Sequence, residues 1–263
     1  MRLIVNADDF GYFRSVSDGI LRAHRDGIVT ATTMLVAAPD SERAARLLAD
    51  APDLDVGVHL NLTFDRPAGD VDEHGRFLSP DLTRRRSLVD ERGRFLKPTE
   101  LLKRDIDRAE ALEEFRSQYE RARHLIGREP THLDTHHWVH DHPALEWAIG
   151  QLAVETGAAA RIHSDAQRDR LRARRVRTPD HFAREFQYEG KVSVDSLLAL
   201  LRRLAAREGV TELMCHPGEE DEAMVKRSGY ARERSVELAT LTDPRVRATL
   251  DELDIALTTF AAV

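Results

Sequence analysis

The chain has almost no cysteine and no long apolar run. Its 263 residues include one cysteine, Cys215, which excludes an internal disulfide and fits a reducing compartment. No window is apolar enough to span a membrane, and the N-terminus lacks the long apolar stretch of a signal peptide. We therefore expect a cytoplasmic protein without a membrane span.

Positive charge is scarcer than negative charge. The 39 Lys and Arg residues and the 46 Asp and Glu residues give a net charge of -7, which argues against broad nucleic-acid binding. Hydrophobic residues make up 41% of the chain and charged residues 32%, enough for a sizeable core with a solvated surface. The length suits one domain, and we treat residues 1–263 as a single domain.

Short apolar runs alternate with stretches whose apolar residues recur at helical spacing. This alternation predicts the right-handed parallel units of an α/β domain. About seven strands with intervening helices are enough for a (β/α) barrel, complete or incomplete. The predicted strands are residues 2–6, 31–37, 54–62, 131–135, 158–162, 210–215 and 255–260, and the predicted helices lie within 16–27, 41–50, 99–126, 143–156, 194–207 and 232–253.

The alternation fails between residues 64 and 98, which we interpret as a long inserted loop over one end of the domain. This loop contains a repeat: residues 72–80 read DEHGRFLSP and residues 90–98 read DERGRFLKP. Each copy has a glycine that we expect in a turn and a Phe-Leu pair that we expect to anchor the loop. Two interpretations stay open, a substrate lid and a duplicated surface loop without a role.

Unusual polar residues follow four of the predicted strands. Asp8 and Asp9 end the first strand, His59 and Asn61 end the third, and a histidine-rich segment and His216 follow two later ones. Because the carboxyl ends of parallel strands form one face, we expect these side chains to converge. Two adjacent carboxylates after a buried strand are costly unless a cation or proton transfer uses them, although a solvated turn is the alternative.

The segment 131–142 holds five of the twelve histidines. Alternation along a strand puts His132, Asp134 and His136 on one face. Clustered histidines with convergent carboxylates favour a metal site, and two histidines with one carboxylate leave positions open for water and substrate. The same ligand set occurs in iron oxygenases, and a non-catalytic sugar-binding module is a third interpretation.

Four motifs together resemble the YdjC-like carbohydrate deacetylases, a family that includes the chitooligosaccharide deacetylases. The motifs are residues 6–11 (NADDFG), 57–63 (GVHLNLT), 131–140 (THLDTHHWVH) and 215–218 (CHPG), and they span almost the whole chain. The resemblance implies an incomplete TIM-like barrel. It also implies a hydrolase that removes N-acetyl groups from acetylated amino sugars or short glycans.

The resemblance also implies the roles of individual residues. Asp9, His59 and His136 match the ligands of one divalent metal ion, magnesium or zinc. Asp8 matches the family's base and His216 its acid. These roles agree with the chemistry of metal-assisted hydrolysis, in which a base takes a proton from water and a separate acid protonates the departing amine.

One motif departs from the family pattern. The family usually reads His-His-His-Val-His where residues 136–140 read His-His-Trp-Val-His, so we expect Trp138 to alter the substrate pocket. We expect Asn61, Trp138, His140 and Arg161 to contact the substrate, with a structural ion pair as the favoured alternative for Arg161. An apolar helix face leaves a homodimer open.

Overall fold

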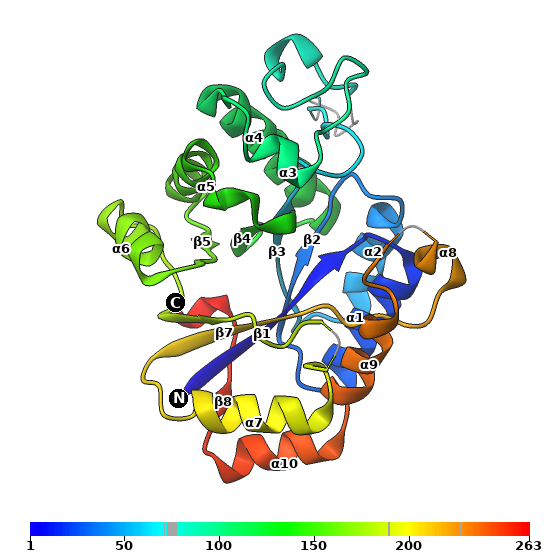
Figure 1. The fold of residues 1–263 in the computed structure, drawn as a ribbon, viewed down its shortest axis with the longest axis vertical. Helices are drawn as coiled ribbons and strands as arrows, with labels where there is room; N and C mark the ends of the chain where they lie inside the picture. Colours follow the sequence, from blue (N-terminus) through cyan, green and yellow to red (C-terminus); the bar gives the residue numbers. More distant parts are fainter. Residues whose placement is uncertain (71, 73–77, 189, 227) are drawn as a thin grey trace.

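A curled sheet of parallel strands runs through the middle of the molecule, with helices packed around it (Figure 1). This computed structural model describes residues 1–70, 72, 78–188, 190–226 and 228–263. The strand order is β5-β4-β3-β2-β1-β7-β6, and β8 pairs with the beginning of β1. The strands are β1 (Arg2–Phe10), β2 (Ala31–Met34), β3 (Asp55–Leu60), β4 (His132–Thr135), β5 (Ala159–Ala160), β6 (His181–Ala183), β7 (Val210–Cys215) and β8 (Ala256–Leu257).

The barrel is incomplete, which confirms the predicted fold class. The edge strands β5 and β6 do not pair with each other in the described part of the chain. The guanidinium of Arg161, just after β5, lies 5.2 Å from the ring centroid of Phe182 in β6 and bridges this gap. We did not predict β6, since three residues are too short to show a strand pattern, and β8 is shorter than the predicted strand 255–260.

The first strand is an interior strand of the sheet. Every residue from Leu3 to Phe10 is buried, because β1 pairs with β2 on one side and β7 on the other and both of its faces are covered. The strand therefore carries its last residues, including Asp8 and Asp9, into the buried end of the barrel.

Helix ends follow local capping chemistry. The predicted helix 99–126 is two helices, because the chain leaves the helical path after α3 and Asp107 starts α4 by accepting a hydrogen bond from the Ala109 amide at 2.8 Å. Gly127, with φ of 74°, ends α4. The helices are α1 (Arg14–Arg25), α2 (Ser41–Leu47), α3 (Pro98–Leu101), α4 (Arg108–Ile126), α5 (Pro143–Thr156), α6 (Asp165–Ala173), α7 (Val194–Leu204), α8 (Glu222–Val225), α9 (Arg232–Leu241) and α10 (Pro244–Glu252), with short helical turns η1 (Leu48–Asp50), η2 (Leu82–Arg84), η3 (His136–Asp141) and η4 (Phe260–Ala262).

The loop 64–98 lies beside α3 and α4, at the top of Figure 1, and a buried arginine anchors it. Arg85 donates hydrogen bonds to Glu114 at 2.5 Å and to the Ser117 hydroxyl at 2.8 Å, both on α4. In the second repeat Gly93 adopts a left-handed turn and Phe95 is buried, as predicted. Gly75 and Phe77 of the first repeat lie outside the described residues, whereas Leu78 is described and exposed, so the prediction that Leu78 anchors the loop is wrong.

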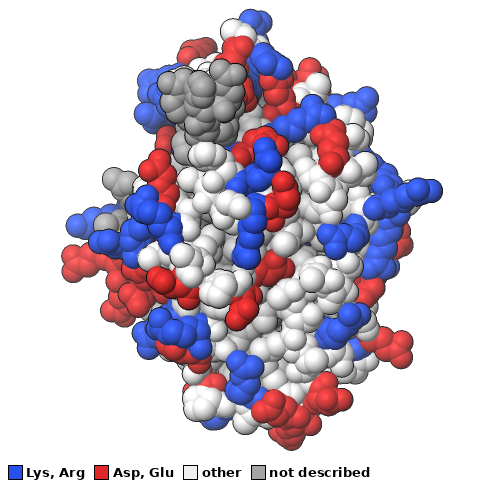
Figure 2. Space-filling view, turned by 180° about the vertical axis from the view of Figure 1, so that it is seen from behind, with Lys and Arg blue, Asp and Glu red and all other residues white. Residues whose placement is uncertain are grey.

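Charges of both signs are interspersed on the face shown in Figure 2. Several exposed charged side chains form ion pairs, such as Arg116 with Glu155 and Arg170 with Glu146, both at 2.6 Å. In the described part of the chain, the helices are too short or too polar to cross a lipid bilayer.

Candidate active site

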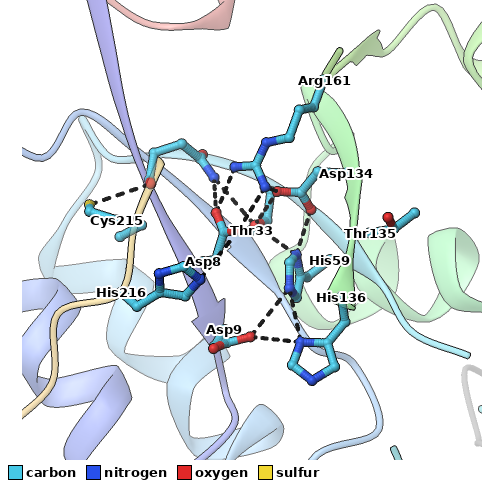
Figure 3. Close-up of polar contacts among 12 residues, drawn as sticks. Asp8, Asp9, Thr33, His59, Asp134, Thr135, His136, Arg161, Cys215 and His216 are labelled. Carbon is cyan, nitrogen blue, oxygen red and sulfur yellow. Dashed lines mark hydrogen bonds and ion pairs between the residues drawn. The ribbon is translucent and has the colours of Figure 1, made fainter. Parts of the chain in front are cut away.

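A break in β1 lets two neighbouring carboxylates face the same end of the barrel. Successive residues of a regular strand point to opposite faces. In β1 the register with β2 shifts between Ala7 and Phe10, and Asp9 has a φ of 75°, a left-handed conformation that is rare outside glycine. Asp8 and Asp9 are therefore both buried, close to histidines at the carboxyl ends of β3, β4 and β7 (Figure 3).

Asp9, His59 and His136 converge on one point (Figure 3). Asp9 Oδ1 lies 3.2 Å from His59 Nε2 and 3.1 Å from His136 Nδ1, and the two nitrogens are 3.2 Å apart. All three side chains are buried, and Asp9 Oδ1 has no hydrogen-bond donor among the described residues. Two imidazole nitrogens and one carboxylate oxygen are a donor set that suits a divalent metal ion, so the residues fit the predicted ligand set.

A second layer of side chains orients His59. Its Nδ1–H donates to Asp134 Oδ1 at 2.6 Å, which turns Nε2 toward Asp9. Asp134 Oδ2 in turn accepts hydrogen bonds from Thr33 and Arg161, both at 2.9 Å. Burial raises the pKa of the Asp134 carboxyl, but the charges of Arg161 and His59 outweigh burial and lower it.

Proton and metal compete for the His59 imidazole. Burial lowers the pKa of this imidazole, but the carboxylates of Asp134, Asp9 and Asp8 together outweigh burial and raise the pKa to about 10 in the metal-free protein. A ligand histidine must give up this proton to bind a cation, so binding of a metal here is coupled to proton release.

Asp8 is held by a different set of partners. Arg161 donates to both of its oxygens, at 2.6 and 2.7 Å, and Asn6 donates to Oδ1 at 2.8 Å. Arg161 is buried, and its Nε donates to Glu212 at 2.7 Å. A second cluster of potential metal ligands, Asp8 with His59 and Asp134, is therefore disfavoured, because the Arg161 cation lies between its two carboxylates.

His216 follows β7 and approaches Asp8 from another strand (Figure 3). Its Nε2 is 3.9 Å from Asp8 Oδ2, and its backbone N–H donates to Glu237 at 2.5 Å. Burial lowers the pKa of the His216 imidazole to about 4 and raises the pKa of the Glu237 carboxyl to about 8. The imidazole is therefore uncharged at neutral pH.

A cavity of about 340 Å³ opens onto these groups. Its floor contains Asp8, Asp9 and the three histidines described above, and aromatic side chains form much of its wall. Among the described residues of the loop 64–98, Pro98 alone lines this cavity. The aromatic lining residues are Tyr12, Trp138, Tyr188 and Tyr230.

The predicted substrate contacts fall into two groups. Trp138 and Arg161 line the cavity, although the Arg161 donors face carboxylates, as in the structural ion pair that we favoured. Asn61 and His140 are buried and do not belong to the described cavity lining. The Asn61 side chain instead accepts hydrogen bonds from the two amides of residues 63 and 64, and His140 Nδ1 bonds to Thr135 at 2.5 Å.

Sequence reasoning gave no role to several charged groups near the site. The position of Asp134 could be inferred from the sequence, because residues two apart on a strand point to the same face and Asp134 lies two residues before His136. Arg234 and Glu237 had none, because they belong to α9, a helix without a distinctive motif, and only packing brings it to the site.

Comparison with known proteins identifies the family of this chain. The model of the YdjC-like protein family matches residues 2–252. A carbohydrate deacetylase of Geobacillus stearothermophilus is 38% identical over 262 residues, which cover 98% of this chain and 96% of that protein. A crystal structure of a proposed cellobiose-phosphate cleavage protein from Enterococcus faecalis has a TM-score of 0.88 at 33% identity and covers 99% of this chain and 97% of that one.

A more distant structure shares the fold. The family 4 carbohydrate esterase of Streptomyces lividans has a TM-score of 0.51 at 13% identity, over 98% of this chain and 91% of that one. The match to the family model and the two full-length relatives confirm the family resemblance seen in the motifs. The chain belongs to the YdjC-like protein family.

Proposed function

We propose that the protein is a metal-dependent carbohydrate deacetylase that removes N-acetyl groups from amino sugars or short glycans. The observation that carries this proposal is that the two adjacent carboxylates have different partners. Asp9 faces two imidazoles, whereas Arg161 binds both oxygens of Asp8. Full-length relatives that are named carbohydrate deacetylases support the same reaction.

In this proposal Asp9, His59 and His136 hold the divalent ion, magnesium or zinc. When bound, such an ion lowers the pKa of a water ligand and polarises the carbonyl of the acetamide. Asp134 keeps His59 in the tautomer that has Nε2 free for the ion.

Asp8 is the general base. Its carboxylate takes a proton from the attacking water, and its neighbours prevent it from rotating away, since Arg161 and Asn6 hold its oxygens. Arg161 in this role is a positioning residue for Asp8. Asn61 and His140 have structural roles, and Trp138 keeps its predicted role as a substrate contact.

His216 is the acid that protonates the departing amine. Because the pKa of the His216 imidazole is lowered to about 4, it carries no extra proton at neutral pH. The proton that it delivers must therefore arrive during the reaction, and Asp8 Oδ2 at 3.9 Å from His216 Nε2 is its source. The aromatic wall of the cavity suits the apolar faces of a sugar ring.

Metal reconstitution tests this proposal. The protein is stripped of metal, reloaded with magnesium, zinc or iron in turn, and assayed for acetate release from diacetylated chitobiose. We expect acetate release only from the magnesium- or zinc-loaded protein. Dioxygen consumption by the iron-loaded protein without acetate release would favour an oxygenase, and sugar binding without turnover under all conditions would favour a binding module.

A further inference from the structure

Arg234 pairs with the oxygen of Asp9 that faces away from the histidines. Its Nη2 donates to Asp9 Oδ2 at 2.5 Å, whereas Asp9 Oδ1 lies between His59 and His136. Arg234 is only 3% exposed, and it lines the same cavity as Asp9. The two oxygens of this carboxylate therefore have separate partners.

Close backbone packing fixes where Arg234 can lie. Its Nε donates to the Tyr230 carbonyl at 3.0 Å, and its own carbonyl accepts from the Gly218 amide at 3.1 Å. A Cβ atom at Gly218 would lie 3.2 Å from Arg234 Cβ, and one at Gly19 would lie 2.5 Å from Gly218 Cα. Gly218, the last residue of the CHPG motif, thus lets α9 and Arg234 approach the site.

Stability alone does not explain this pair. A buried ion pair is often no more stabilising than apolar side chains of the same volume, because both charges lose their hydration. Arg234 Nη1 is also buried without a hydrogen-bond acceptor in the described part of the chain. Placing a guanidinium here is costly, which points to an effect of Arg234 on Asp9 itself.

We propose that Arg234 is a positioning residue that reserves one oxygen of Asp9, so that Asp9 gives the metal ion a single oxygen. Carboxylates bind cations through one oxygen or through two, and each bound oxygen uses a coordination position. The Arg234 charge on Oδ2 repels a cation from that oxygen. A catalytic site must keep positions open for water and substrate, and Arg234 preserves one of them. This inference rests on the proposed metal-dependent function.

A role of the Arg234 charge in metal coordination predicts a different phenotype from a role in folding alone. Replacing it by methionine, Arg234→Met, removes a cation close to the ion and frees Asp9 Oδ2 for binding. The variant should therefore bind metal at least as tightly as the wild type, yet turn over more slowly because a coordination position is lost. A residue that only supports the fold would instead lower thermal stability, metal affinity and turnover together.

The test compares the wild type, Arg234→Met, Arg234→Lys and the control Arg232→Met, which changes an exposed arginine of the same helix. Zinc affinity is measured by calorimetry, and Asp9 coordination is measured in zinc-loaded crystals. We expect one Asp9 oxygen on zinc in the wild type and two in Arg234→Met, with kcat lowered about 10- to 100-fold and not restored by excess zinc. Arg234→Lys should regain part of kcat, and Arg232→Met should match the wild type.

Two results would overturn the inference. One is a wild-type crystal in which both Asp9 oxygens bind zinc, a result that needs no variant to fold. The other is an Arg234→Met protein that loses zinc affinity and recovers full turnover with excess zinc. Failure of the proposed function is a separate outcome: a zinc-loaded wild type without deacetylase activity leaves the Asp9 coordination fully measurable.

Discussion

Arg161 donates hydrogen bonds to both carboxylate oxygens of Asp8, at 2.6 Å to Oδ2 and 2.7 Å to Oδ1. Arg161 follows β5 at one edge of the sheet, and Asp8 lies near the end of the interior strand β1, with three strands between β5 and β1 in the sheet order. The pair therefore crosses the interior of the curled sheet. Opposing carboxylates from three strands, Asp8 on β1, Asp134 on β4 and Glu212 on β7, hold the guanidinium in place, so the orientation of Asp8 depends on the curvature of the sheet.

Asp134→Asn should weaken metal binding. The amide cannot accept the His59 Nδ1–H as strongly as the carboxylate does at 2.6 Å, so His59 loses its fixed tautomer. We expect a loss of about 10- to 100-fold in metal affinity, measured by calorimetry on the metal-free protein. Glu212→Gln is the matched control, because Glu212 also contacts Arg161 but not His59. Equal losses in both variants would contradict a specific effect on His59.

His132→Gln should flatten the acid side of the stability profile. Burial lowers the pKa of the His132 imidazole from 6.5 to about 4, so between these values the unfolded chain binds a proton that the folded chain does not. The free energy of unfolding therefore falls as the pH is lowered through this range. Glutamine does not titrate and can still donate to Asn6, which bonds to His132 Nε2 at 2.9 Å.

The effect of His132 is measured by urea unfolding at several pH values. A shift of this size corresponds to up to about 3 kcal/mol, since one pKa unit is worth about 1.4 kcal/mol. The other buried histidines are present in both proteins, so the difference in slope isolates His132. Identical slopes for the wild type and His132→Gln would contradict the prediction.

Arg85→Met should destabilise the fold without changing catalysis at the assigned site. The substitution leaves the Glu114 carboxylate buried without its cation, which costs about 3–5 kcal/mol in comparable cases. Arg84→Met is the control, because Arg84 pairs with Glu113 on the surface, where an ion pair is worth less than about 1 kcal/mol. Chemical denaturation and kcat are measured for both; unchanged stability of Arg85→Met would show that the loop 64–98 is not anchored by this pair.

The convergence of Asp9, His59 and His136 was predictable because each of them ends a strand. The carboxyl ends of parallel strands lie on one face of the domain, and this does not depend on how the helices pack. The spacing to His136 predicts the face on which Asp134 lies. It does not predict that Asp134 bonds to His59, because that contact depends on the register of β3 and β4. The turn that Asn61 forms with residues 63 and 64 could not be predicted either, because it is a local feature that strand spacing does not reveal.

The contacts of Arg234 and Arg85, which lie outside the strands, could not be predicted from the sequence. Arg234 reaches Asp9 because α9 packs closely against the turn after β7, and no periodicity in the sequence indicates that contact. The ion pair of Arg85 with Glu114 could not be predicted either. Arg85 lies in the loop 64–98, where the repeat indicates roles for its glycines and aromatic residues but not for this arginine. The break between α3 and α4 was not predicted because Leu102 and Ile106, four residues apart, keep a helical apolar spacing across it.

The separate roles of Asp8 and Asp9 are tested most directly by measuring metal content and acetate release on the same preparations of Asp8→Asn and Asp9→Asn. Asp8→Asn should keep its metal and lose turnover by about 10²- to 10⁴-fold, because the amide cannot accept a proton from water. Asp9→Asn should lose metal and regain part of its activity with excess metal. An Asp8→Asn protein that is empty of metal, beside an Asp9→Asn protein that is loaded but inactive, would contradict the account.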